Sequence, residues 1–150
     1  MKYEIIAKSY NELHKKEQLN KVKLIIKLLN IRDEKVLDVG CGTAFYSDLF
    51  KNYTGIDSSK EMLKQSKANV IQEDGEKLYF KDNSFETVIS VSAIHNFKDP
   101  IKGIKEIKRV AKNKIAISVF KRAKNFKVIE KELKDFKKLK EEKDIIFYKN

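Results

Sequence analysis

The sequence predicts a three-layer α/β sandwich, with a mostly parallel sheet of about six strands and helices on both faces. Short apolar segments alternate with helix-like segments along all 150 residues, which is the pattern of βαβ units. No internal repeat and no Gly/Ser/Pro-rich linker divides the chain, so we expect one domain. Right-handed crossovers between parallel strands would place helices on both faces of the sheet.

The first half of the chain supplies three of the expected strands. We expect, in order, a helix over 4–29 in one or two pieces, a strand over 35–39, a helix over 44–51, a strand over 53–57, a helix over 59–67 and a strand over 68–72. Ser58 or Ser59 can cap the helix that follows it, because a serine hydroxyl accepts from a free N–H of the first turn.

The second half continues the alternation. The expected elements are a strand over 86–91, a helix over 101–111, a strand over 115–120, a helix over 125–143 and a last strand over 145–148. Pro100 precedes the first of these helices, where a first turn tolerates proline. The long helix is predicted from apolar residues at three- and four-residue steps, namely Phe126, Ile129, Leu133, Phe136 and Leu139.

The composition excludes several classes of protein. Hydrophobic residues make up 41% of the chain, yet no apolar run approaches the ~20 residues that span a membrane, so we expect no membrane association. Cys41 is the single cysteine, which excludes an intramolecular disulfide framework and favours a reducing, cytoplasmic location. No cluster of histidine, cysteine and carboxylate residues has metal-ligand spacing, so no metal is predicted.

The net charge of +11 is concentrated in the last third of the chain. Residues 101–150 carry 17 basic and seven acidic side chains, whereas residues 36–100 carry seven basic and ten acidic ones. Two interpretations remain open: a solvated lysine surface, as in a thermophile-like composition, or a surface that follows an RNA backbone. Only three of the 33 basic residues are arginine, the residue that makes bidentate phosphate contacts.

Candidate binding residues follow three of the predicted strands. Gly40 and Gly42 form a turn in which a ligand can approach the backbone, although an ordinary tight turn would look similar. Asp57 can accept from both hydroxyls of a ribose, and Asp74 can accept from an exocyclic amine. Because the carboxyl ends of parallel strands meet at one edge, these residues should lie together.

These segments resemble the motifs of class I S-adenosylmethionine-dependent methyltransferases, which have a Rossmann-like fold. The similar segments are 36–44 (VLDVGCGTA), 55–58 (GIDS) with Met62-Leu63, 73–80 (EDGEKLYF) with 82–88, and 92–97 (SAIHNF). The last is similar to the subgroup that includes quinone-biosynthesis and wobble-uridine tRNA methyltransferases. Ala44 replaces a usual glycine and Glu86 a common aspartate. The closing hairpin of the family would keep one strand, so the chain is interpreted as small and C-terminally truncated.

The resemblance implies one domain over 1–150, with a helical cap at 1–34, a cofactor-binding core at 35–120 and a C-terminal helix and last strand at 121–150. It implies S-adenosyl-L-methionine as the cofactor. The implied cofactor-binding residues are Tyr10, Asp38, Gly40, Cys41, Gly42, Asp57, Ser58, Met62, Asp74, Gly75 and Ser90. Tyr10 would close over the cofactor, and Tyr3 is a second candidate for that role.

The expected function is methyl transfer from S-adenosylmethionine to an unidentified acceptor by in-line displacement. His95 is the candidate general base, with a partly buried structural histidine as the alternative. A second hypothesis is a cofactor-binding subunit that acts on tRNA or protein with a partner chain, either a second copy or an activator subunit. The acceptor, a small molecule or a tRNA or protein, is not identified by the sequence.

Overall fold

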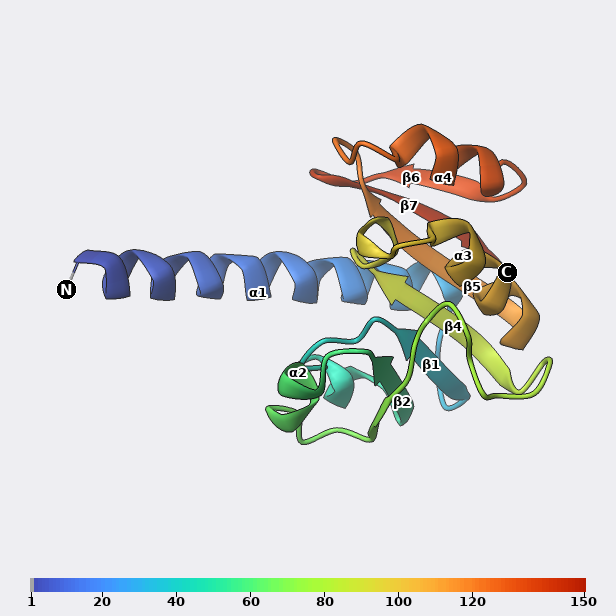
Figure 1. Cartoon of the computed structure of the whole chain (residues 1–150), viewed down its shortest axis with the longest axis horizontal. Helices are drawn as coiled ribbons and strands as arrows, with labels where there is room; N and C mark the ends of the chain where they lie inside the picture. Colours follow the sequence, from blue (N-terminus) through green and yellow to red (C-terminus); the bar gives the residue numbers. More distant parts are fainter. Residues whose placement is uncertain (1) are drawn as a thin grey trace.

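The computed structural model describes the backbone of residues 2–150 and the side chains of residues 11–150. Seven strands form one sheet in the order β3-β2-β1-β4-β5-β7-β6. The first five of these pair in parallel, whereas β7 runs antiparallel to both β5 and β6 (Figure 1). The predicted α/β sandwich with a mostly parallel sheet is confirmed, with seven strands in place of about six.

The elements follow the predicted alternation. The helices are α1 (Lys2–Leu29), α2 (Lys60–Lys64), α3 (Pro100–Val110) and α4 (Phe126–Glu132), with 3-10 turns η1 (Ser47–Leu49) and η2 (Ile94–Asn96). The strands are β1 (Lys35–Val39), β2 (Asn52–Asp57), β3 (Val70–Gln72), β4 (Phe85–Val91), β5 (Ala111–Phe120), β6 (Lys137–Lys140) and β7 (Asp144–Lys149).

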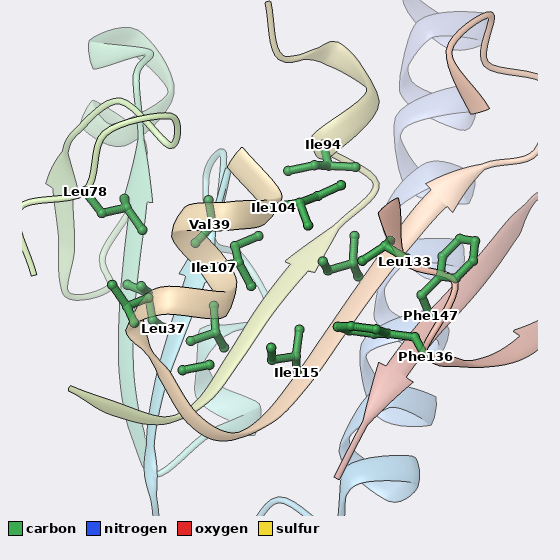
Figure 2. Close-up of a cluster of buried hydrophobic side chains, with 14 of the residues drawn as sticks. Leu37, Val39, Leu78, Ile94, Ile104, Ile107, Ile115, Leu133, Phe136 and Phe147 are labelled. Carbon is green, nitrogen blue, oxygen red and sulfur yellow. The ribbon is translucent and has the colours of Figure 1, made fainter. Parts of the chain in front are cut away.

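Alternating strand residues divide the core between the two faces of the sheet. On one face, Ile104 and Ile107 of α3 and Leu133 after α4 pack with Leu37 and Phe147 (Figure 2). On the other face, apolar residues of α1 pack against the neighbouring positions of β1, β4, β5 and β7. The residues of this second cluster include Val22, Ile25, Leu29, Val36, Ile89, Ala116 and Ile146. The N-terminal half of α1 extends beyond the sheet (Figure 1).

Local sequence signals set the helix ends. Asn30 adopts φ +51 after α1, and the N–H of Ile31 donates to the carbonyl of Ile26, which closes the helix as a left-handed C-terminal cap. The Ser59 side chain accepts from the N–H of Met62, as one of the two predicted serine caps for α2. Asp99 caps α3 in the same way, directly before Pro100.

Three predicted helices are shorter than expected. The segment 44–51 forms only the single 3-10 turn η1, and α2 is confined to Lys60–Lys64. The predicted helix over 125–143 ends at Glu132, and Lys137–Lys140 form the edge strand β6. Because β6 pairs with β7, the antiparallel hairpin that the sequence analysis expected to lack a strand has both. Long-range pairing has overridden the helical spacing of Leu133, Phe136 and Leu139.

Candidate functional site

Two adjoining pockets lie at the carboxyl edge of the parallel strands. The larger has a volume of about 920 Å³ and the smaller about 450 Å³. Both are lined by the residues Gly40, Asp57, Ser58, Asn96 and Phe97, which come from the turns after β1, β2 and β4. The predicted residues after these strands are therefore brought together, as the rule for parallel sheets requires.

The turn after β1 is fixed by hydrogen bonds to β2. The N–H groups of Gly40 and Cys41 both donate to the carbonyl of Ile56 at 2.8 and 2.9 Å. Gly40 has φ +80, and a Cβ there would lie 2.6 Å from the Cβ of Ala93. Gly42 has φ +57 with open space where a Cβ would be. The turn therefore needs glycine at both positions, once for a close approach and once for its backbone conformation.

Asp57 joins the glycine turn to the segment after β2. Its Oδ2 accepts from the N–H of Gly42 at 2.8 Å, and its Oδ1 accepts from the N–H of Ser59 at 2.8 Å. A carboxylate oxygen has two lone pairs, so each oxygen can accept one further hydrogen bond from a ligand. Asp57 lines both pockets and is half-buried, so it can contact a ligand that extends across them.

The smaller pocket contains Asp74 and Gly75. Asp74 forms a turn in which its Oδ1 accepts from the N–H of Glu76 at 2.9 Å. A Cβ at Gly75 would lie 2.5 Å from the ring of Phe97, and one at Gly103 would lie 2.7 Å from the same ring. Phe97 therefore packs closely against both glycines, and it forms part of the wall shared by both pockets.

Asp38 lies below the site and lines neither pocket. Its side chain is fully buried, and its Oδ2 accepts from the hydroxyls of Tyr46 and Tyr53, both at 2.6 Å. Its Oδ1 has no hydrogen-bond partner in the described structure. Burial raises the pKa of Asp38 to about 6, although the two tyrosine hydroxyls stabilise the charged form.

Three further predicted residues lie at or near the pockets. Met62 and Cys41 line the larger pocket, whereas Ser90 is buried beneath it and donates from its hydroxyl to the carbonyl of Val39 at 2.8 Å. Burial, together with the charges of Asp38 and Asp57, raises the pKa of the Cys41 thiol, which therefore stays protonated.

His95 lines neither pocket. Its Nδ1 is buried without a hydrogen-bond partner in the described structure, and its ring lies 6.1 Å from the ring of Phe120. Its pKa is lowered, chiefly by burial. We assign no step to His95, and its role as a base stays a prediction. The side chains of Tyr10 and Tyr3 lie outside the described residues.

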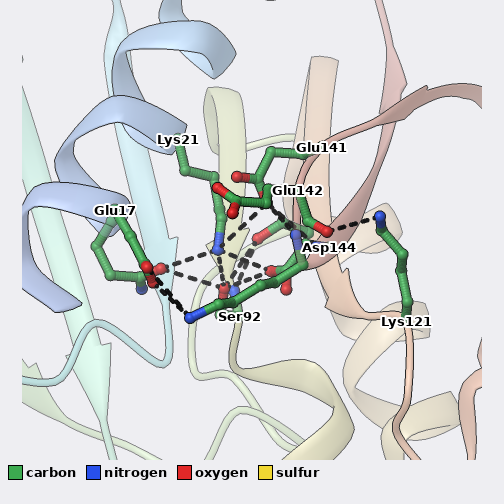
Figure 3. A network of polar contacts seen from close by, with 10 residues as sticks. Glu17, Lys21, Ser92, Lys121, Glu141, Glu142 and Asp144 are labelled. Carbon is green, nitrogen blue, oxygen red and sulfur yellow. Dashed lines mark hydrogen bonds and ion pairs between the residues drawn. The ribbon is translucent and has the colours of Figure 1, made fainter. Parts of the chain in front are cut away.

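Polar residues of α1 and of the segment directly after β4 also line the larger pocket, and the sequence did not predict them as site residues. These are Asn11, His14, Lys15, Gln18, Ser92 and Asn96. Behind Ser92 lies a buried ion pair between Lys21 of α1 and Asp144 of β7, with Nζ and Oδ2 3.0 Å apart (Figure 3). In the sequence, Lys21 adjoins an apolar run and Asp144 begins a strand. Neither residue belongs to a periodic pattern or a motif that would indicate a buried ion pair.

The chain belongs to the methyltransferase-domain family, whose model matches residues 37–117. A demethylmenaquinone methyltransferase of Thermotoga maritima is 33% identical over 98 residues, which is 58% of this chain and 43% of that protein. The chain spans about half the length of the first curated relatives that it matches.

Two solved structures show the same fold. A protein of Methanococcus maripaludis, proposed to be an S-adenosylmethionine-dependent methyltransferase, has a TM-score of 0.78 at 15% identity, covering 96% of this chain and 91% of that one. A proposed methyltransferase of Haloferax volcanii, solved with the methyltransferase activator Trm112, has a TM-score of 0.65 at 21% identity, covering 75% of this chain and 57% of that one. The class I methyltransferase fold is thereby established for this chain.

The described residues contain neither a candidate metal site nor a candidate membrane span. No group of three or more histidine, cysteine, aspartate or glutamate residues there could hold a metal ion. Within the same part of the chain, every helix is too short or too polar to cross a membrane.

Proposed function

We propose that this chain is an S-adenosylmethionine-dependent methyltransferase. The observation that carries the proposal is Asp57, a carboxylate at the end of β2 that lines both pockets and binds the glycine turn of β1. In parallel sheets an acidic residue at this position holds ribose hydroxyls, which would place a nucleoside across the junction of the two pockets.

The site fits this cofactor by shape. Gly40 and Gly42 keep the turn free of side chains, and Gly75 leaves the smaller pocket open beside Phe97. The adenine would occupy the smaller pocket, where Asp74 can accept from its amine and Ser58 and Asp57 line the entrance. The methionine portion would extend along the glycine turn into the larger pocket, past Cys41 and Met62.

Asp38 and Ser90 support this arrangement from below. Asp38 anchors Tyr46 and Tyr53 beneath the turn, and Ser90 fastens the end of β4 to Val39 of β1. Both residues would therefore act by fixing the backbone that the cofactor contacts. Asp38 also has one buried oxygen without a partner, which is available to a cationic amine if the turn opens slightly.

The bound cofactor would supply a methyl group on a sulfonium, which is displaced in line by the acceptor. The chain's own contribution is to hold the two reactants close together in the right orientation. Such positioning can correspond to an effective molarity of ~10⁵–10⁸ M. Residues of α1, together with Ser92 and Ala93 directly after β4, line the larger pocket but not the smaller one, so we place the acceptor there. They include Asn11, Gln18 and Ser92.

A second candidate is a methyltransferase subunit that needs a partner chain, either a second copy or an activator. The observation that favours it is the Haloferax volcanii structure, in which a protein of this fold is bound to an activator. Light scattering of the purified chain, followed by a transfer assay, separates the two candidates. A monomer that transfers methyl groups by itself would exclude the need for a partner.

The primary test is calorimetry with S-adenosylhomocysteine. We expect the wild type to bind and Asp57→Ala to lose at least ~100-fold in affinity, because two charge-assisted hydrogen bonds and the support of the glycine turn disappear together. Asp33→Ala is the matched control, since Asp33 lies in an exposed ion pair with Lys51. Undetectable binding by the wild type, or unchanged binding by Asp57→Ala, would contradict the proposal.

A further inference from the structure

Ser92 is held in place by the buried pair of Lys21 and Asp144. Lys21 is 6% exposed and Asp144 is 2% exposed. The Nζ of Lys21 lies 2.9 Å from the Oγ of Ser92, which in turn lies 2.6 Å from Oδ2 of Asp144 (Figure 3). Three segments far apart in the sequence, namely α1, the end of β4 and the start of β7, therefore meet at one hydroxyl group.

The backbone of Ser92 is equally constrained. Ser92 has φ +52, a left-handed conformation that is unusual for a residue with a side chain. Its N–H donates to the hydroxyl of Ser118 at 2.8 Å and also lies 3.1 Å from the Ser118 carbonyl. A strained residue that the surroundings fix this firmly is typical of functional positions.

The chemistry of the neighbours determines which way the Ser92 hydroxyl is polarised. The ammonium group of Lys21 can only donate, and the carboxylate of Asp144 can only accept. Ser92 therefore accepts from Lys21 and gives its own proton to Asp144. The second lone pair on Oγ has only a long contact, 3.5 Å, with the hydroxyl of Ser118. Because Ser92 lines the larger pocket, that lone pair is available to a donor on a bound molecule.

Gln18 completes the pattern from α1. Its Oε1 accepts from Nζ of Lys21 at 3.0 Å, which fixes the orientation of the amide, because lysine cannot accept. The NH₂ group of Gln18 then remains for the larger pocket, which Gln18 also lines. The pocket wall thus offers one hydrogen-bond acceptor, on Ser92, beside one donor, on Gln18.

The larger pocket has room for a second molecule. Its volume of about 920 Å³ is near the upper end of the ~300–1,000 Å³ that one small ligand fills. Under the proposed function the adenine of the cofactor lies in the smaller pocket and the ribose at the junction of the two pockets. Neither Ser92 nor Gln18 lines that smaller pocket.

We infer, resting on the proposed function, that Ser92 and Gln18 bind the methyl acceptor. The acceptor then carries an O–H or N–H group that donates to Ser92, at or next to the methylated atom, and a carbonyl-type oxygen that accepts from Gln18. Lys21 and Asp144 are positioning residues that orient both side chains. The positive charge of Lys21 is balanced by the negative charge of Asp144. This side of the pocket therefore favours a polar acceptor, and the acceptor need not be an anion.

The test separates cofactor binding from methyl transfer. S-adenosylhomocysteine affinity is measured by calorimetry, and transfer is measured with methyl-labelled S-adenosylmethionine and cell extract fractionated into small molecules, RNA and protein. Ser92→Ala and Gln18→Ala should each lower the initial rate roughly tenfold or more while affinity for S-adenosylhomocysteine changes less than about threefold. Ser84→Ala, at an exposed loop serine before β4, should match the wild type.

Gln18→Ala also guards against a folding defect in Ser92→Ala, because Gln18 is partly exposed. The inference is overturned if both variants transfer at the wild-type rate, or if affinity for S-adenosylhomocysteine falls as much as the rate. It is also overturned if the wild type binds S-adenosylhomocysteine yet labels no fraction, because the chain then holds no acceptor by itself. If the wild type did not bind S-adenosylhomocysteine, that result would overturn the proposed function instead.

Discussion

The N–H of Gly42 donates to Oδ2 of Asp57 over 2.8 Å, so the carboxylate that ends β2 also shapes the glycine turn after β1. Its second oxygen accepts from the N–H of Ser59. The amide in Asp57→Asn has a single accepting oxygen, so one of these N–H groups would face an NH₂ donor. We expect the free energy of unfolding to fall by about 1–3 kcal/mol in urea titrations.

The same variant should bind S-adenosylhomocysteine at least ~10-fold more weakly, because the turn and the ribose contact are impaired together. Calorimetry beside the urea titration measures both effects on one sample. Asp33→Asn, in an exposed ion pair, is the control and should change neither quantity. If Asp57→Asn were as stable as the wild type, the two hydrogen bonds would not support the turn.

Gly75→Ala tests the close contact between Gly75 and Phe97. The added Cβ would lie 2.5 Å from the ring and 3.1 Å from Cγ1 of Val39, and Gly103 also packs closely against the same ring. Because these neighbours leave no room for the added methyl group, we expect a loss of about 1–3 kcal/mol in unfolding free energy. Phe97→Leu should partly relieve the clash, so the double variant should lose less than the sum of the single losses. Additive losses would show that Phe97 does not confine Gly75.

Asp38 should make stability depend on pH. Its pKa is raised from 3.8 to about 6 in the folded state, so the folded chain holds the proton more tightly than the unfolded chain. The stabilising contribution is therefore largest in acid and is lost as the pH rises through about 6. Relative to Asp38→Asn, the wild type should lose about 1 kcal/mol of unfolding free energy between pH 5 and pH 8.

The comparison with Asp38→Asn removes the effect of His95. Burial lowers the pKa of His95, so its contribution is present at high pH and is lost on acidification, opposite in sign to that of Asp38. Both proteins contain His95, and its effect cancels in the difference. Urea titrations at several pH values give the measurement, and a difference independent of pH would contradict the raised pKa of Asp38.

The sequence predicted the sheet and the site well where the signals were local. Val36 to Val39 followed by glycine, and Ile56-Asp57 followed by Ser59, carry strand, turn and cap information within a few residues, and the structure places them as expected. The rule that parallel strands share one carboxyl edge then brought Gly40, Asp57 and Asp74 together without any structural information.

Non-local interactions decided the elements that the sequence did not predict. Lys137–Lys140 have good helix formers, yet they pair with β7 as an edge strand, where their three lysines also discourage further pairing. In the same way, nothing local marks Lys21, whose partners Ser92 and Asp144 lie 71 and 123 positions away. Buried polar contacts of this kind depend on the finished fold and leave no periodic pattern.

The Lys21–Asp144 pair should be costly to break singly and much less costly to remove completely. Lys21→Met leaves the Asp144 carboxylate buried with the Ser92 hydroxyl as its donor. Asp144→Asn leaves Glu141, 4.0 Å away, as the carboxylate beside the ammonium of Lys21. We expect each single variant to lose about 3–5 kcal/mol of unfolding free energy, as for other buried pairs. The double variant should lose clearly less than the sum, because no unpaired buried charge remains.

Urea titrations of the four proteins form a double-mutant cycle that measures this coupling. The exposed pair of Lys138 and Glu130, 3.1 Å apart, is the control, and the same cycle on it should give a coupling of at most about 1 kcal/mol. If the two cycles gave equal coupling, the buried pair would not fix the position of α1 on the sheet. A large coupling in the buried cycle, with transfer activity still reduced in the double variant, would tie Lys21 and Asp144 to the placement of Ser92 rather than to stability alone.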